Sequence, residues 1–198
     1  MTESLIIHLR DGAAPQWMVC NEDGNVIVNA VSGELSQATA MSVGRRVVVI
    51  LPASEALVAD SEAPAKSAAK LAQVIPYALE ERVADEIESL HFALGERDAT
   101  SGRVPVVVIE RARIDARIAE LHAAGLSPTA VYSEASLLPS MPGQMIALLD
   151  GDTLTLRTAD SVPLVMPALS INDAFEMALA TQVAPVAGLE AAPLGLLL

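Results

Sequence analysis

Short runs in which apolar and polar residues alternate open the chain and predict β-strands. The first three such runs cover residues 5–9, 16–20 and 25–29. Between the second and third lies Glu-Asp-Gly-Asn at residues 22–25, which is typical of a hairpin turn. Residues 46–52 form an unbroken β-branched run, so we expect an interior strand buried on both faces. Residues 56–60 predict a further short strand.

The pattern then becomes helical. Pro64 suits the first position of a helix over residues 65–75, because its missing N–H has no partner to lose there. Pro76 is expected to break or kink this helix, which restarts over residues 84–88. In the second part an apolar stripe is expected from Leu79, Val83, Ile87 and Leu90. Glu81, Asp85 and Glu88 would give another, acidic face.

Strands and one clear helix are predicted in the second half. The strands are expected at residues 90–94, 104–109, 129–132, 145–149, 153–157 and 162–166. An amphipathic helix is expected over residues 111–124, with Gly125 as its left-handed cap. Asp150-Gly151 predicts a tight turn, residues 140–143 a loop, and residues 170–173 a capping box that opens a helix to about residue 180. Two meander-plus-helix units in one chain indicate a duplicated α/β architecture.

Composition narrows the class of protein. The chain has 198 residues, of which 52% are hydrophobic and 19% charged, as in a folded globular protein. Its net charge is −13, and Lys66 and Lys70 are the only lysines. This charge disfavours nucleic acid and direct adhesion to anionic lipid, and it favours a basic protein partner.

The single cysteine, Cys20, excludes an intramolecular disulfide and a zinc site built on cysteines. It is expected to be a small core residue, and it indicates a reducing compartment. The N-terminus lacks the basic segment and long apolar run of a signal peptide. No apolar stretch reaches the roughly 18 residues that a membrane span requires.

The central segment resembles a known family. The run IPYALEERVAD at residues 75–85, followed by LHFALG at residues 90–95, is similar to a pattern of the type II secretion system L proteins. The strand at residues 5–9 before Trp17, the VPVVVIERARIDARIAELHAAGL stretch at residues 104–126 and the LLDG turn at residues 148–151 agree with it. The resemblance covers about residues 3–180.

This resemblance implies a fold, a place and partners. It implies an α/β, actin-like (ribonuclease H-like) two-lobed fold with mixed sheets flanked by helices. Residues 1–135 would form the first lobe, with a helical insertion around 64–94. Residues 136–182 would form the second lobe, of three strands and a helix, and residues 183–198 a linker toward a membrane helix absent from this sequence.

The resemblance also implies a docking role at the cytoplasmic face of the bacterial inner membrane. Such a domain binds the N-terminal domain of the secretion ATPase (protein E) and couples it to protein M and other platform components. A homodimer is a further possibility. No catalytic activity and no cofactor are expected.

An actin-like fold raises the question of nucleotide. Weak candidates are Asp11 and Gly12 in the first hairpin and Asp150 and Gly151 in the second. The first hairpin lacks a phosphate-binding hydroxyl, and Pro15 removes a donor N–H, so plain turns are favoured. The three histidines, His8, His91 and His122, lack metal-type spacing and are expected to be ordinary packing or surface residues.

Candidate residues for a protein interface are Glu80, Glu81, Asp85, Glu88 and His91. The alternative is a solvated face. An exposed strand edge, in the strands that follow Val104 or Met145, is an equally physical site. Two rival functions stay open. One is an actin-like ATPase whose ATP affinity depends on Asp11 and Asp150, and the other is an actin-like assembly protein of type IV pili that docks a short peptide.

Overall fold

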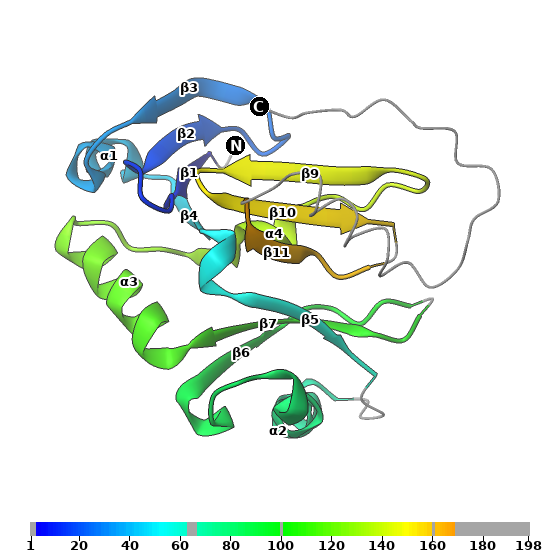
Figure 1. Cartoon of the computed structure of the whole chain (residues 1–198). Helices are drawn as coiled ribbons and strands as arrows, with labels where there is room; N and C mark the ends of the chain where they lie inside the picture. The colour runs from blue at the N-terminus through cyan, green and yellow to red at the C-terminus, as the bar shows by residue number, and fades with distance from the viewer. Residues whose placement is uncertain (1–2, 63–66, 100, 160, 169–198) are drawn as a thin grey trace.

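Three β-sheets, with helices packed on two of them, make up the computed structural model (Figure 1). It describes residues 3–62, 67–99, 101–159 and 161–168. The five-stranded sheet has the order β3-β2-β1-β4-β8. Its strands are β1 (Ser4–His8), β2 (Gln16–Cys20), β3 (Val26–Ser32), β4 (Arg46–Leu51) and β8 (Ala130–Ser133). β1 pairs antiparallel with β2 and parallel with β4, so this sheet is mixed.

Alternation along the strands places the main core on one face of this sheet. Leu5 pairs with Val19 and Val47, and Ile7 pairs with Trp17 and Val49. All six are buried against α1 (Leu35–Ser42) and α3 (Arg111–Ala123). The left-handed Gly125 (φ +79°) ends α3 as expected, because a side chain is strained in that conformation.

The second sheet has the order β5-β7-β6, and all its pairings are antiparallel. Its strands are β5 (Leu57–Ser61), β6 (Leu90–Leu94) and β7 (Val104–Glu110). Its core contains Leu71 and Ile75 from α2 (Ala68–Ala78), together with Leu79 and Leu90.

The third sheet has the order β11-β10-β9 and is antiparallel throughout. Its strands are β9 (Met145–Asp150), β10 (Thr153–Thr158) and β11 (Leu164–Pro167). The short α4 (Glu134–Leu137) follows β8 and leads toward this sheet (Figure 1).

The predicted strands are confirmed to within a few residues, and Cys20 is a buried, free cysteine. Two-sided burial of the strand at residues 46–52 is only partly right. Val47, Val49 and Leu51 are buried, but Val48 and Ile50 on the other face are half-buried. The helix α1 was not predicted. The expected helix at residues 170–180, the expected linker and Pro64 lie outside the described residues.

The predicted helix restart is wrong. α2 runs through Pro76 to Ala78, and the N–H of its C-cap residue Leu79 donates to the Ile75 carbonyl at 3.1 Å. Two 3₁₀ turns follow, Glu80–Arg82 and Ile87–Ser89. Leu79 and Leu90 pack in the same core, but they come from the end of α2 and from β6. Their spacing therefore reflects this shared core and not one face of a helix. Within the described residues, no helix has both the length and the apolarity to cross a bilayer.

Candidate functional site

An ion pair joins the ends of two strands that are distant in sequence. Arg10 follows β1, and Asp150 ends β9. The Arg10 guanidinium donates to Asp150 Oδ1 through Nε at 2.8 Å and through a second nitrogen. The Asp150 side chain is only 9% exposed and that of Arg10 28%. The hydrogen bond to Asp150 raises the pKa of Arg10, desolvation opposes this, and the charges of Asp150 and Glu134 add to the rise.

The two turns proposed as weak nucleotide candidates meet at this point. Asp11 accepts a hydrogen bond from the Ser54 hydroxyl at 3.1 Å. A Cβ added at Gly151 would lie 3.5 Å from the Asp11 carbonyl oxygen. The structure therefore brings Asp11, Asp150 and Gly151 into one junction, whereas a Cβ added at Gly12 would meet nothing within 4 Å. The cationic partner of Asp150 in this junction is the chain's own Arg10.

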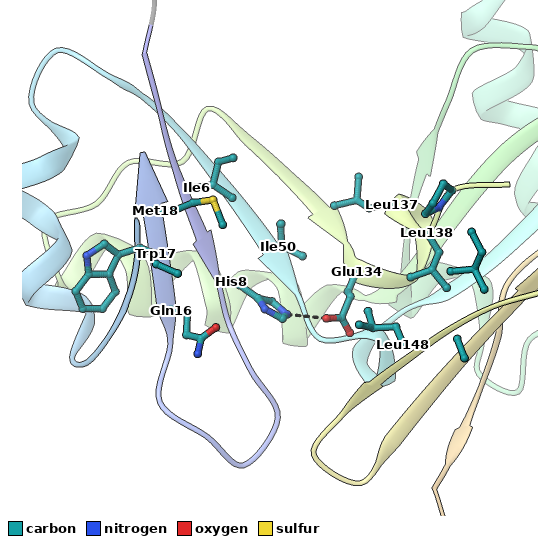
Figure 2. A pocket seen from close by; sticks show the side chains of 14 residues that line it. Ile6, His8, Gln16, Trp17, Met18, Ile50, Glu134, Leu137, Leu138 and Leu148 are labelled. Carbon is teal, nitrogen blue, oxygen red and sulfur yellow. Dashed lines mark ion pairs between the residues drawn. The ribbon is translucent and has the colours of Figure 1, made fainter. Parts of the chain in front are cut away.

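His8 and Glu134 lie beside this junction, because a ligand atom of each is within 4.8 Å of one from Asp150. His8 Nε2 is 2.9 Å from Glu134 Oε1 (Figure 2), with the side chains 24% and 10% exposed. The pair has the distance of an ion pair, yet Nε2 is a buried atom without a hydrogen bond of acceptable geometry. We therefore regard it as a close contact that leaves Nε2 unsatisfied.

A groove of about 320 Å³ opens next to His8 and Glu134. It lies between the face of the five-stranded sheet opposite its core and the α4–β9 region (Figure 2). Most of its wall is apolar, and it includes Ile6, Met18, Ile50, Leu138 and Leu148. His8, Gln16 and Glu134 are its polar lining residues.

A second ion pair ties α3 to the 3₁₀ turn Ala53–Glu55. Arg117 donates two hydrogen bonds to Glu55, whose side chain is 8% exposed, and a third to Glu120 at 2.8 Å. These hydrogen bonds raise the pKa of Arg117, that to Glu55 most, and desolvation opposes them. We assign this pair a structural role, because the Arg117 guanidinium is already hydrogen-bonded to both Glu55 and Glu120.

The predicted interface residues lie on one exposed segment. Glu80, Glu81, Asp85, Glu88 and His91 are all exposed. Within the described chain, none of these five side chains forms an ion pair. The prediction that these residues form the acidic face of a helix is wrong, because the segment consists of 3₁₀ turns and the start of β6. Its uncompensated negative charge remains.

Tyr77, at the end of α2, is 67% exposed and precedes this acidic segment directly. Sequence reasoning missed it, because the helix was expected to end before Pro76 and Tyr77 was not placed on any face. An exposed aromatic beside unpaired charges is a common composition of protein interfaces.

Of the two strands predicted to offer an exposed edge for docking, one is not at the edge of its sheet. The strand that begins at Val104 is β7, the middle of its sheet, so both of its edges are paired. The strand that begins at Met145 is β9, at an edge of the third sheet. β3 is also an edge strand, and Val26, Ile27 and Val31 on it are exposed.

Comparisons with known sequences point to one family. The profile of the family described as "Type II secretion system (T2SS), protein L" matches residues 6–191. A Type II secretion system protein L from Pectobacterium carotovorum is 30% identical over 146 residues, which cover 72% of this chain and 34% of that protein. One from Pseudomonas aeruginosa is 37% identical over 76 residues, 38% of this chain and 20% of that protein. The aligned regions thus span about a third of these relatives or less.

Two solved structures are similar. One is the cytoplasmic domain of EpsL, an inner membrane component of the type II secretion system of Vibrio cholerae. It has a TM-score of 0.70 at 25% identity and covers 87% of this chain and 74% of that chain. The other, a PilM-PilN type IV pilus biogenesis complex, has a TM-score of 0.58 at 15% identity, covers 90% and 65%, and bears on the fold alone. The predicted α/β, actin-like fold is confirmed.

Proposed function

Because the chain belongs to the type II secretion system protein L family, we propose that it is a non-catalytic docking domain that binds the N-terminal domain of the secretion ATPase. It acts at the cytoplasmic face of the inner membrane, where it couples the ATPase to protein M and the rest of the platform. The observation that carries the proposal is the likeness to the cytoplasmic domain of an inner membrane secretion component.

The surface supports a protein partner. Docking needs accessible groups whose interactions are incomplete, and the segment from Tyr77 to His91 offers them. Tyr77 is an aromatic anchor, and the unpaired carboxylates beside it attract a basic surface. The net charge of −13 steers such a partner toward the domain.

We expect saturable one-to-one binding when this domain is titrated calorimetrically with the N-terminal domain of the secretion ATPase encoded with it. The affinity should be micromolar or tighter, about −8 kcal/mol or below. Tyr77→Ala should weaken binding at least about tenfold, because it removes the aromatic contact. The triple reversal Glu81→Lys, Asp85→Lys, Glu88→Lys should weaken it about tenfold or more, with a reduced dependence on salt.

Matched controls are available on other surfaces. Tyr132→Ala removes a 42%-exposed tyrosine from β8, and Glu22→Lys with Asp23→Lys reverses two exposed charges at the β2–β3 turn. Both should leave the affinity unchanged within about twofold. Equal losses in test and control variants would assign the effect to overall charge. Absence of binding at two temperatures would contradict the docking role of this domain.

The nucleotide alternative rests on the meeting of the two turns. The close approach of the Asp11 carbonyl to Gly151, and the pairing of Asp150 with Arg10, both oppose entry of a phosphate chain between the turns. We expect titration with Mg-ATP to give no saturable heat up to millimolar concentrations. Binding that Asp11→Asn abolishes would instead establish the ATPase-like alternative.

A further inference from the structure

We propose that His8, Glu134 and Asp150 form a binding site for a divalent transition-metal cation of the zinc class. The three residues come from β1, α4 and the end of β9, so the fold alone brings them together. One ligand atom of each lies within 4.8 Å of the other two. One imidazole nitrogen with two carboxylate oxygens is a donor set that suits zinc and its neighbours.

The distances between the three ligand atoms fit a single ion after small side-chain movements. Zinc binds imidazole nitrogen and carboxylate oxygen at about 2.0–2.2 Å, so ligand atoms in a tetrahedral site lie about 3.3–3.6 Å apart. His8 Nε2 and Glu134 Oε1 are 2.9 Å apart, slightly closer than this. The widest separation in the cluster, at most 4.8 Å, closes with a side-chain movement of about 1–1.5 Å.

Unsatisfied buried atoms supply an independent argument for a ligand. His8 Nε2 is buried without a hydrogen bond. The Glu134 residue is 8% exposed, and among the described residues the one side chain paired with its carboxylate is His8, at 2.9 Å. A carboxylate buried to this degree is costly unless its interactions are complete. A cation between Nε2 and the carboxylate would satisfy both groups at once.

Arg10 supports such a site. Both of its hydrogen bonds go to Oδ1 of Asp150, and in the described part of the chain Oδ2 accepts none. Oδ2 is therefore the atom available to a metal, while Arg10 orients the carboxylate from outside, as hydrogen-bonding partners of metal ligands usually do. The two carboxylates and Arg10 carry a net charge of −1, which also favours a cation.

A fourth coordination position would face the groove, since His8 and Glu134 both line it. There a water molecule or a group from a bound protein could complete the tetrahedron. The ion would connect the five-stranded sheet to α4 and to the third sheet.

The test is equilibrium dialysis of the folded chain against Zn²⁺, in a buffer with excess Mg²⁺ to suppress weak binding by surface carboxylates. We expect one Zn²⁺ per chain at micromolar affinity or tighter. His8→Gln and Glu134→Gln should each weaken it at least about tenfold. The exposed His122 is the matched control, and His122→Gln should leave the affinity unchanged.

A second measurement uses the unmodified protein, so it does not depend on whether a variant folds. The chain has three histidines, so ¹⁵N shifts of the imidazoles in the unmodified protein identify which one binds the ion. A Zn²⁺-dependent shift confined to His8 supports the site. A shift at His91 or His122, affinity unaffected by His8→Gln, or no stoichiometric binding overturns it and leaves His8 and Glu134 as a close contact without an ion.

Discussion

Replacing Arg10 with methionine is expected to lower the free energy of unfolding by about 2–4 kcal/mol. Methionine keeps most of the volume of the arginine stem but removes the charge. Asp150, with a side chain only 9% exposed, would then lose its cationic partner while lying next to buried Glu134. The Arg10 side chain is itself 28% exposed, so water relieves part of the cost, and the value should fall below that of a fully buried pair.

Urea denaturation followed by far-UV circular dichroism measures this change. Arg46→Met is the matched control, because Arg46 is an exposed arginine on the neighbouring strand β4 and should change stability by at most about 0.5 kcal/mol. The double variant Arg10→Met, Asp150→Asn should be less destabilised than the sum of its single variants, since the unpaired charge has gone. If Arg10→Met unfolds at the same urea concentration as the parent, the ion pair does not hold the two turns together.

Strands were predictable because their pattern is local. Leu5 and Ile7 alternate with half-buried positions, and one face of a sheet imposes this period of two on the sequence. The order β3-β2-β1-β4-β8 was not predicted, because pairing between strands distant in sequence leaves no local pattern. The helix α1 was missed because only Leu35 and Ala38 on it are buried, too few to produce a clear helical period.

The false helix at residues 84–88 has the opposite cause. Leu79, Val83, Ile87 and Leu90 are spaced as on a helix, yet only the first and last are fully buried. Pattern alone cannot distinguish four residues on one helix from two anchors with a partly exposed connection between them.

The junction was predictable only in part. Family resemblance paired the Asp11 and Asp150 turns, but nothing local indicates that Arg10 reaches a partner 140 residues away. His8 and Glu134 illustrate the same limit. His8 was assigned to ordinary packing because metal spacing was sought within short motifs. The parallel pairing of β1 with β4 and of β4 with β8 instead places the ends of β1 and β8 at one edge of the sheet.

Replacing Ile75 with alanine is expected to cost about 2–5 kcal/mol of stability. Ile75 is 0% exposed and lies in the core between α2 and the β5-β7-β6 sheet, where truncation leaves a cavity that surrounding residues fill only in part. The adjacent residue provides the control. Val74 on the same helix is 42% exposed, so Val74→Ala should change stability by at most about 0.5 kcal/mol.

This substitution also tests whether the second sheet unfolds together with the first. The only tryptophan, Trp17, is 3% exposed in the core of the five-stranded sheet, so its fluorescence reports that core and not the one around Ile75. β7 runs directly into α3, which buries Leu121 beside Trp17's sheet, and this continuity should couple the two cores. We therefore expect Ile75→Ala to shift the fluorescence and dichroism transitions equally. An unchanged Trp17 transition beside a displaced dichroism transition would mean that the second sheet unfolds alone, and that the acidic segment between Leu79 and Leu90 belongs to a separately unfolding unit.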